Sequence, residues 1–508
     1  GIRVQVWREM FQANGWKVLD AKYGKSLQDA FKQPKGELLK DCIDGMSNEL
    51  YQRLLRVDAS MLREWLPRAS QYPKDLAQFI SDWDGPRLQS VFRNLGGHDF
   101  EVLDEVFGKL TPSNGPSVVF AYTLKGWMLP SVGDPQNHSV NLSGEQMEEF
   151  RESLGISEDE MFSGLPRGSD GDRICRDVGE KLKIAKNPSL AIPEIDIPNG
   201  FGRTYRGKMS SQQIFGLVLT DISRNTPDVS ERMVTVSPDV ASSTNLGGWI
   251  NKSGVWSKVG KESIPDEDAI RALQWVESEK GQHLELGISE NNLFLCLGQL
   301  GLSYETNGQL LFPIGTLYDP FVRRGLDAFV YSVSSGARFI VVGTPSGVTL
   351  GPEGGSHQSI VTPSIGIELP DLAFYEPCFG QELEWIILHA LRKVQMREEC
   401  AYIRLTTKKI NQDLFNQPAD SVMKEHLRDQ VVKGAYMHTD RGGELRYNPG
   451  SNVINIFASG VMVPEAIEAS SMLLEEEVYA NVINVTAPGL LYRSFQKSVQ
   501  PDLRGGLG

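Results

Sequence analysis

Residues 281–321 read GQHLELGISENNLFLCLGQLGLSYETNGQLLFPIGTLYDPF, and residues 338–359 read RFIVVGTPSGVTLGPEGGSHQS. Glu290 lies in an otherwise uncharged segment, directly before an apolar run typical of a buried helix. Phe321 opens the next helical pattern, after Pro320. His357 follows a glycine-rich loop that leaves the apolar strand predicted at 339–342. These alternating patterns predict consecutive α/β units with a parallel sheet.

A carboxylate, an aromatic ring and an imidazole therefore lie at the edges of consecutive α/β units, where open parallel sheets bind ligands. A buried Glu290 could take part in proton transfer, since burial raises the pKa of a carboxyl group. The alternative is a glutamate favoured only by the positive end of a helix dipole. For His357 the alternative is an ordinary histidine in a surface loop.

Bulk composition narrows the class of protein. A chain of 508 residues suggests about three domains at ~150 residues each. The net charge of −14 argues against nucleic acid or an anionic membrane as the main partner. The five widely spaced cysteines, without a Cys-x-x-Cys motif, favour buried free thiols in a reducing compartment. No apolar run reaches membrane-spanning length, so a cytoplasmic protein is expected.

The first part of the chain has its own organisation. Residues 3–13 have helical spacing and residues 16–21 form a short strand pattern. Residues 25–93 are mostly helical and resemble an insertion into an α/β layer. Asp99 is a plausible N-cap for the helix after it. Residues 117–124 (SVVFAYTL) are apolar enough for an interior parallel strand.

Composition also predicts the domain boundaries. Residues 1–160 form the first domain, and the Gly-, Pro- and Ser-rich segment 161–209 is a linker. Residues 210–406 form the second domain, which contains the opening stretch. A second linker covers 407–430, and 431–508 is a short third domain.

Other candidate motifs are weaker. His138 lies in a polar loop, and His98, beside Asp99, is expected to support a helix start. The remaining histidines (His283, His389, His426 and His438) have no metal-ligand spacing. The glycines of the loop (Gly343, Gly347, Gly351, Gly354 and Gly355) are too irregular for a dinucleotide or Walker fingerprint. The acidic turn at 169–172 (SDGD) lacks the strand and glycine that a metal–diphosphate turn requires. We therefore predict no metal ligands in the chain.

Together these segments resemble the thiamine-diphosphate enzymes of the transketolase superfamily, in particular the homodimeric pyruvate dehydrogenase E1 component. The resemblance rests on NLGGHDFEVLDEVF, VVFAYTLKGW and NHS in that order, on the helical insertion, and on GISENN, FPIGTLYDPF, GTPSG and EGGSHQS. It spans nearly the whole chain. It implies an α/β thiamine-diphosphate-binding fold, with consecutive domains of parallel sheet flanked by helices.

The resemblance also implies roles for individual residues. Glu290 matches the glutamate that hydrogen-bonds the aminopyrimidine ring of thiamine diphosphate, and Phe321 matches the aromatic residue that stacks on that ring. His357 matches an active-site histidine, and His138 matches a histidine of a mobile loop that serves reductive acyl transfer. Lys125 and Tyr318 are similar to further residues of the cofactor pocket.

By the same resemblance, the chain is expected to use thiamine diphosphate and Mg²⁺. The reaction would be decarboxylation of a 2-oxo acid of the pyruvate type, with transfer of the acyl unit to a lipoyl group on an E2 acyltransferase. The superfamily binds its cofactor between subunits, which implies a homodimer with Glu290 acting across the interface. No nucleic-acid or membrane partner is expected.

Two features depart from the family pattern. Gly247 stands where the bacterial pyruvate enzyme has an acidic residue, in a run that is closer to transketolase. The Gly-Asp-Gly and Asn motif for magnesium and diphosphate is absent, and the third domain is short. We expect either an internal fragment, whose metal and diphosphate ligands lie outside this chain, or a degenerate homologue.

Two other functions remain open. One is ketol transfer by a transketolase, whose sugar-phosphate anchors correspond here to Pro345 and Thr407, so that a phosphorylated sugar would lack charged partners. The other is a non-catalytic scaffold that retains the fold without the metal–diphosphate site.

Overall fold

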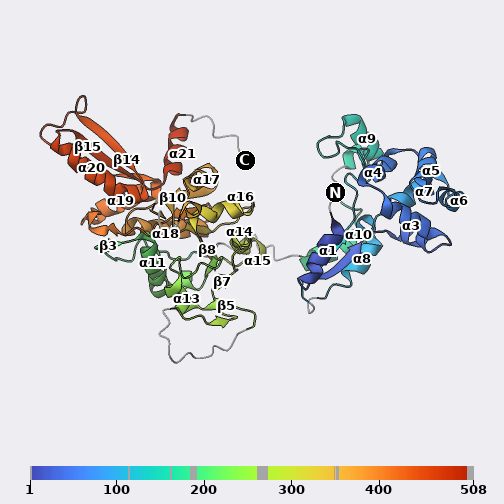
Figure 1. The fold of residues 1–508 in the computed structure, drawn as a ribbon, viewed down its shortest axis with the longest axis horizontal. Helices are drawn as coiled ribbons and strands as arrows, with labels where there is room; N and C mark the ends of the chain where they lie inside the picture. The colour runs from blue at the N-terminus through green and yellow to red at the C-terminus, as the bar shows by residue number, and fades with distance from the viewer. Residues whose placement is uncertain are drawn as a thin grey trace. The chain divides into compact units, whose positions relative to one another are not determined.

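The computed structural model describes residues 3–111, 115–160, 163–182, 192–259, 273–347, 349–350 and 354–499. Part of the expected first linker (183–191) and Gly351 of the loop before His357 lie outside these residues. The chain forms two compact units, residues 1–176 and 177–508. They are described separately as the first and second unit (Figure 1).

The first unit is built on two parallel strands, β1 (Lys17–Ala21) and β2 (Ser117–Ala121). Helices α1 (Val4–Ala13) and α8 (Phe100–Phe107) pack on β1. Asp99 caps α8 as expected, because its carboxylate accepts the Val102 N–H. The prediction that β2 is an interior strand is wrong. It pairs only with β1 among the described strands, and most of its residues are half-buried.

The segment between β1 and β2 contains a helical subdomain with its own apolar core. Its helices are α2 (Lys25–Phe31), α3 (Gly36–Gly45), α4 (Asn48–Arg56), α5 (Ala59–Arg68), α6 (Pro73–Phe79) and α7 (Gly85–Arg93). Side chains of Ser47, Asp58 and Asp84 cap α4, α5 and α7. The expected helical insertion at 25–93 is therefore confirmed.

After β2 the chain passes through a loop to α9 (Gly144–Ser153), which begins with a Ser143–Gln146 capping box. Within the segment expected to be a linker, residues Asp170–Leu182 form α10, none of whose residues is buried. The boundary between the two units falls inside this helix. Cys175 on α10 is exposed, so the expectation of buried thiols fails there, whereas Cys42, Cys378 and Cys400 are buried.

The second unit contains an eight-stranded sheet in the order β10-β11-β9-β8-β4-β7-β5-β6, and all its strand pairs are parallel. The strands are β4 (Met233–Ser237), β5 (Val255–Trp256), β6 (Glu277–Ser278), β7 (His283–Glu285), β8 (Phe312–Leu317), β9 (Ile340–Gly343), β10 (Leu372–Tyr375) and β11 (Cys400–Arg404). The parallel α/β sheet is confirmed.

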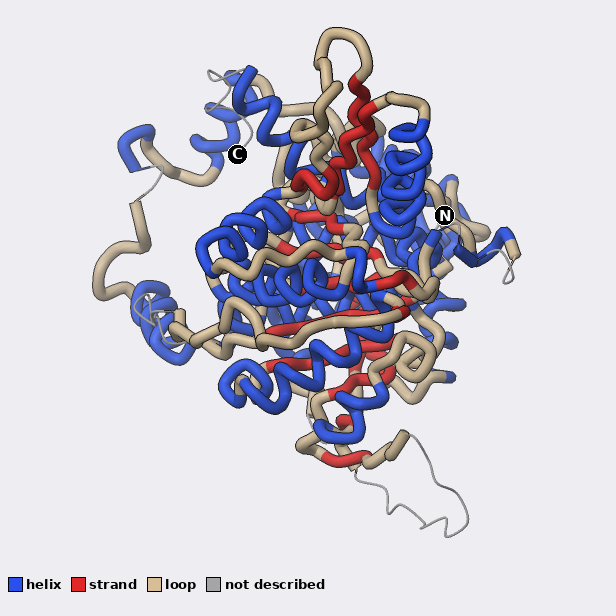
Figure 2. The backbone as a smooth tube through the Cα atoms, turned by 90° about the vertical axis from the view of Figure 1, so that its left-hand side faces the viewer, coloured by secondary structure: helices blue, strands red, loops and turns tan. Residues whose placement is uncertain are grey.

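Helices cover both faces of this sheet, as Figure 2 shows. On one face lie α11 (Ser211–Asn225), α13 (Gly247–Ser253) and α18 (Gly380–Gln395), and on the other lie α14 (Glu290–Gly301), α16 (Leu326–Ser334) and α17 (Thr362–Glu368). Successive strand residues alternate between the two cores. Ile340 and Val342 belong to the core of the first face, whereas Val341 belongs to that of the second. Burial of both faces explains why the strands read as continuous apolar runs.

The last part of the second unit is a smaller sheet in the order β13-β15-β14. Its strands are β13 (Ala435–Thr439), β14 (Val453–Ala458) and β15 (Tyr479–Val485). Helix α20 (Val463–Glu475) packs on β15 and β14, and α19 (Ser421–Lys433) packs on β13 and α18. The second unit also contains a short antiparallel strand pair, β3 (Lys208–Met209) with β12 (Ile410–Asn411). Its further helices are α12 (Pro227–Ser230), α15 (Ser303–Asn307) and α21 (Pro488–Val499).

Over the part of the chain that the structure describes, every helix is too short or too polar to cross a bilayer.

Candidate functional site

The principal site lies at the carboxyl ends of β7, β8 and β9, which stand close together in the sheet. Glu290 follows β7 and begins α14. Phe321 follows β8 and is part of the 3₁₀ turn η4 (Asp319–Gly325), so the α-helix expected to open at Phe321 begins only at Leu326. His357 follows β9 and ends the 3₁₀ turn η6 (Gly355–His357). This is the edge at which open parallel sheets bind ligands.

Glu290 is buried, with 7% of its surface exposed. Its Oε1 atom lies 3.2 Å from Nη1 of Arg324, which donates a hydrogen bond to it. The first turn of α14 also places the carboxylate at the positive end of the helix dipole. Glu290 is therefore both the first residue of a helix and a buried carboxylate, so its position agrees with each of the two explanations offered from the sequence.

Two rings, those of Tyr318 and His357, lie beside the Phe321 ring. The ring centroids of Phe321 and His357 are 5.4 Å apart, and Tyr318 lies 6.0 Å from Phe321 and 5.9 Å from His357. The Tyr318 hydroxyl donates to Oγ of Ser243 at 2.8 Å, which joins the loops after β8 and β4. Four residues singled out in the sequence (Glu290, Tyr318, Phe321 and His357) therefore lie near one another at this edge of the sheet.

Arg324 was not predicted from the sequence. Its Cζ atom lies 3.8 Å from the centroid of the Phe321 ring, in the range of a cation–π contact. Its neighbour Arg323 instead donates from Nε to the Pro320 carbonyl at 3.0 Å. Two adjacent arginines on a turn give no periodicity that distinguishes them, so the sequence held no signal for this contact.

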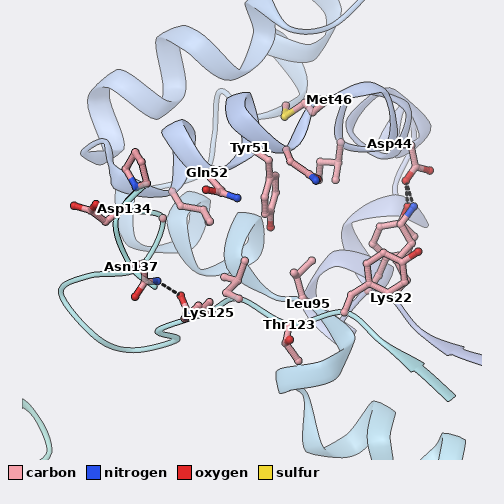
Figure 3. A pocket seen from close by; sticks show the side chains of 18 of the residues that line it. Lys22, Asp44, Met46, Tyr51, Gln52, Leu95, Thr123, Lys125, Asp134 and Asn137 are labelled. Atoms are coloured by element: carbon pink, nitrogen blue, oxygen red, sulfur yellow. Dashed lines mark hydrogen bonds and ion pairs between the residues drawn. The ribbon is translucent and has the colours of Figure 1, made fainter. Parts of the chain in front are cut away.

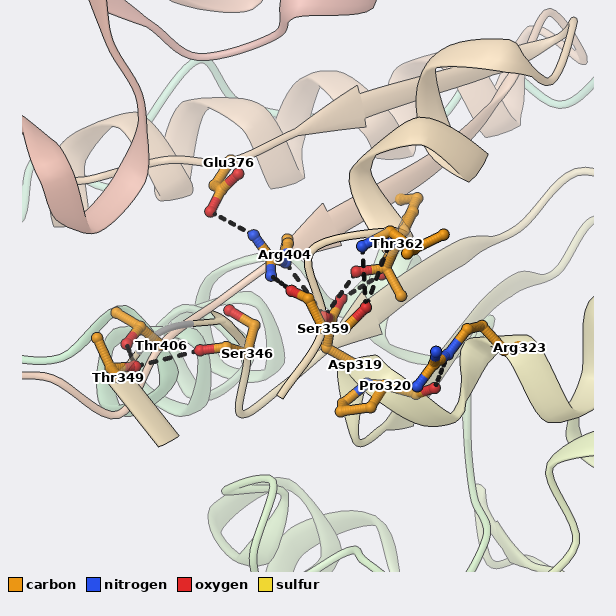
Figure 4. A network of polar contacts seen from close by, with 12 residues as sticks. Asp319, Pro320, Arg323, Ser346, Thr349, Ser359, Thr362, Glu376, Arg404 and Thr406 are labelled. Carbon is orange, nitrogen blue, oxygen red and sulfur yellow. Dashed lines mark hydrogen bonds and ion pairs between the residues drawn. The ribbon is translucent and has the colours of Figure 1, made fainter. Parts of the chain in front are cut away.

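A buried polar network lies beneath the turn that carries Phe321 (Figure 4). Asp319 is fully buried and accepts hydrogen bonds from Tyr402, from Thr362 at 2.7 Å and from Arg404 Nε at 3.2 Å. Arg404 also donates to Glu376 at 2.9 Å and to the Ser359 carbonyl at 2.7 Å. Burial raises the pKa of Asp319 and of Glu376, although Arg404 opposes this effect.

Arg404 and Glu376 also border a cavity of about 630 Å³ against the small C-terminal sheet. Its wall on that side is mainly apolar and includes Ile456, Phe457, Ala458, Val461 and Met462. The network thus separates this cavity from the turn that carries Phe321. Neither feature was predicted from the sequence, because residues of the network that contact one another are up to 85 positions apart in the chain.

Lys125 and His138, the two other predicted site residues, belong to the first unit. Lys125 Nζ lies 2.9 Å from Nδ1 of His138. The Lys125 carbonyl accepts a hydrogen bond from Asn137, which closes the loop between them (Figure 3). Both residues line a cavity of about 550 Å³ between this loop and helices α3 and α4, where Lys22 pairs with Asp44. The structure brings these two residues together in a polar pocket.

His98 has a structural environment. Its Nε2 atom accepts the Leu124 N–H at 2.6 Å, and its ring stacks on Trp127 with centroids 4.6 Å apart. Burial lowers the pKa of His98, which favours the neutral imidazole that this contact needs.

No cluster of three His, Cys, Asp or Glu side chains suited to a metal ion occurs within the described ranges. In the acidic turn at 169–172, Asp172 pairs with Arg176 at 2.8 Å and accepts the Gly168 N–H.

Comparison with solved structures defines the class of fold. A transketolase from Campylobacter jejuni superposes with a TM-score of 0.56 at 17% identity, over 78% of this chain and 56% of that one. A transketolase from Leishmania mexicana superposes with a TM-score of 0.54 at 15% identity, over 84% and 59% of the two chains. The fold is therefore that of these transketolases, as expected.

Within that class, sequence comparison points to one group. Residues 192–414 match the family "Pyruvate dehydrogenase E1 component middle domain". The chain is 23% identical to the pyruvate dehydrogenase E1 component of Cupriavidus necator over 501 residues, 93% of this chain and 53% of that protein. The E1 component of Mycobacterium tuberculosis is 25% identical over 540 residues, 99% of this chain and 56% of that protein. The resemblance to pyruvate dehydrogenase E1 components is confirmed, and the chain spans about half the length of these relatives.

Proposed function

We propose that the chain is part of an E1 component of a 2-oxo acid dehydrogenase complex, which decarboxylates a pyruvate-type 2-oxo acid and transfers the acyl unit to a lipoyl group of an E2 acyltransferase. The observation that carries the proposal is the convergence of Glu290, Phe321 and His357 at one edge of the sheet. The similarity to E1 components over 93% of the chain supports it.

The groups at this edge fit the aminopyrimidine half of thiamine diphosphate. Phe321 offers an aromatic face, and the Glu290 carboxylate lies beside it, where both contact the same Arg324 side chain. An aminopyrimidine needs these two partners, a ring to stack on and an acceptor or donor at its edge. When bound, the cofactor supplies a carbon nucleophile for attack on the 2-oxo acid.

The chain's own residues would then transfer protons and hold the cofactor ring and the substrate in position. Glu290 would exchange a proton with a ring nitrogen of the pyrimidine, and its burial strengthens that hydrogen bond. Phe321 would fix the plane of the ring. His357, 5.4 Å from Phe321, would orient the substrate or donate a proton to it. Tyr318 would support the turn through its bond to Ser243.

The remaining parts of the proposal concern assembly. Lys125 and His138 would contribute from the loop of the first unit, with His138 serving acyl transfer. Mg²⁺ and the diphosphate would be bound by residues outside this chain, and the active protein would be a cytoplasmic homodimer. Residues 1–160 would belong to the diphosphate-type domain, 210–406 to the pyrimidine-type domain and 431–508 to the C-terminal domain, with linkers at 161–209 and 407–430.

The test is a decarboxylation assay on the intact protein with a panel of 2-oxo acids, with and without thiamine diphosphate and Mg²⁺. Glu290→Gln should abolish cofactor-dependent decarboxylation while leaving the circular dichroism spectrum unchanged. Glu398→Gln is the matched control, because Glu398 is an exposed glutamate paired only with Lys393 among the contacts described. Unchanged activity in Glu290→Gln would refute the role of this residue.

A second assay separates this function from ketol transfer. We expect no transfer from a ketose phosphate, because Pro345 and Thr407 replace the charged anchors of a sugar-phosphate site. Robust transfer by the intact protein would show a transketolase instead. Failure of both reactions in an intact protein that lacks the Gly-Asp-Gly motif would favour a scaffold.

A further inference from the structure

Arg324 contacts both groups that the proposed function assigns to the pyrimidine ring. We propose that Arg324 is a displaceable plug of the pyrimidine position, which its guanidinium group occupies in the free chain and leaves when an aminopyrimidine binds. The inference rests on the proposed function and goes beyond it, because it assigns a specificity-determining role to a residue with no predicted role.

The geometry supports this role. A guanidinium group is planar and stacks on aromatic faces, and that of Arg324 lies 3.8 Å from the Phe321 ring centroid. The same group donates to Glu290 Oε1 at 3.2 Å. Arg324 therefore presents a flat cationic surface to the ring and a donor to the carboxylate. These are the two contacts that a stacked aminopyrimidine would make with Phe321 and Glu290.

The contacts of Arg324 are weak enough to be exchanged. Its side chain is 54% exposed, whereas that of Glu290 is 8% exposed. Ion pairs that reach solvent contribute little, and so does a cation–π contact at an exposed site. The long side chain can leave the ring and remain hydrated. Glu290 cannot leave in the same way, because it begins α14 and is buried.

The plug would set a requirement on the ligand. While Arg324 is in place, its charge compensates the buried Glu290 carboxylate. A ligand that only stacks on Phe321 displaces the guanidinium and leaves Glu290 without a partner, which is costly for a buried charge. A ring that both stacks and donates a hydrogen bond replaces both contacts. Arg324 would thus select aminopyrimidines over aromatic molecules without a donor.

The first test measures binding rather than activity. The intact protein, freed of cofactor, is titrated with thiamine diphosphate and Mg²⁺ by calorimetry. Removing the plug in Arg324→Ala should tighten binding by roughly three- to tenfold, the size expected for a lost exposed cation–π contact and ion pair. Arg323→Ala, the matched control, removes the adjacent arginine, which bonds Pro320 instead of the ring, and should leave binding unchanged.

The outcomes separate the plug from the proposed function. Unchanged or weaker binding by Arg324→Ala, with normal binding by the wild type, would overturn the plug alone. Absence of binding to the wild type and to both variants would overturn the proposed function and the plug together. Equal tightening by Arg323→Ala would show a general effect of positive charge and would also overturn the plug.

A second measurement tests the plug without relying on affinity. In protein labelled with ¹⁵N-arginine, the Arg324 Nε–Hε resonance should show a ring-current shift from Phe321, identified by its loss in Arg324→Ala. The shift should disappear in Phe321→Leu and on saturation with thiamine diphosphate. A resonance that does not move in either case would show that the guanidinium is not on the ring, and would overturn the proposal.

Discussion

The Arg404 guanidinium lies against the fully buried carboxylate of Asp319, with Nε 3.2 Å from Oδ2. On its other side it donates to Glu376, whose pKa is raised by burial although Arg404 opposes the rise. Asp319 stands two residues before Phe321. One arginine at the end of β11 therefore compensates two buried acids and supports the turn that carries the aromatic face of the site.

Replacing Arg404 should be strongly destabilising. Arg404→Met leaves two buried carboxyl groups without their cationic partner, so the free energy of unfolding should fall by about 3–5 kcal/mol. Urea denaturation followed by fluorescence measures this change. Arg446→Met is the control, because Arg446 pairs with Glu477 at an exposed position and should change stability by less than about 1 kcal/mol. Equal effects of the two substitutions would contradict a structural role for the network.

A substitution at Gly325 should displace the start of α14, which carries Glu290. A Cβ atom at Gly325 would lie 2.7 Å from the Glu290 carbonyl oxygen and 2.5 Å from the Phe294 ring. Gly325→Ala should therefore push the first turn of α14 away from η4 and destabilise the fold by roughly 1–3 kcal/mol. Gly443→Ala, where a Cβ meets nothing within 4 Å, should be nearly neutral.

The displacement should also be visible at the site. Because Glu290 begins α14, we expect Gly325→Ala to displace the Glu290 carboxylate relative to the Phe321 ring and so to lower the affinity for thiamine diphosphate. Calorimetry on the folded variant at low temperature checks this. Wild-type affinity together with wild-type stability would show that the helix start tolerates the methyl group.

Glu382 should make the second unit less stable as the pH rises. This fully buried side chain accepts hydrogen bonds from Tyr436 at 2.6 Å and from two backbone N–H groups. Burial raises its pKa from 4.5 to about 7, although these hydrogen bonds oppose the rise. The folded pKa exceeds the unfolded one, so its contribution is fully present below about pH 4.5 and is lost as the pH rises through about 7.

The loss should approach about 3 kcal/mol of unfolding free energy between these limits. Denaturation curves from pH 4.5 to 8.5 measure it, and the difference from the non-titrating Glu382→Gln isolates this group. Tyr436→Phe removes a hydrogen bond that favours the charged form, so it should move the transition to higher pH. A difference curve that is flat with pH would contradict the prediction.

Gly133 should control the loop that carries Lys125 and His138. It has φ +76°, and a Cβ there would lie 2.6 Å from the Gln52 carbonyl oxygen of α4. Gly133→Ala is disfavoured by both the backbone conformation and the contact. The loop should detach from α4 and be cut more rapidly in limited proteolysis. Gly155→Ala shares the positive φ but has no atom within 4 Å of its Cβ, so it should leave cleavage of this loop unchanged.

Much of the second unit could be predicted from its sequence, because burial on both faces of a parallel sheet gives continuous apolar strands. The segment 339–342 was recognisable for this reason, and the structure contains β9 there. Strand β2 misled the same reasoning. Its apolar residues predict an interior strand, yet it has one described partner. An apolar sequence pattern indicates that a segment forms a strand, but it does not indicate how many strands pair with it.

The site shows the same limit. Glu290, Phe321 and His357 stand out through local context, a lone charge or ring at the end of a strand. Arg324 and the pair of Asp319 with Arg404 do not, because their significance comes from partners 34 and 85 residues away. The resemblance to a family supplied roles for the first group. It could not supply contacts that depend on the packing of this chain.

The central sheet divides its two faces between different tasks. The core on the α18 face includes Val431 and Tyr436, which belong to the C-terminal part of the chain, whereas the opposite core contains the apolar residues of α14 and α16. Alternate residues of one strand, such as Val341 and Val342, therefore pack into different cores and are constrained by different neighbours. Substitutions on the α14 face can change the start of α14, where Glu290 lies, without altering the contacts that hold the C-terminal part of the chain on the α18 face.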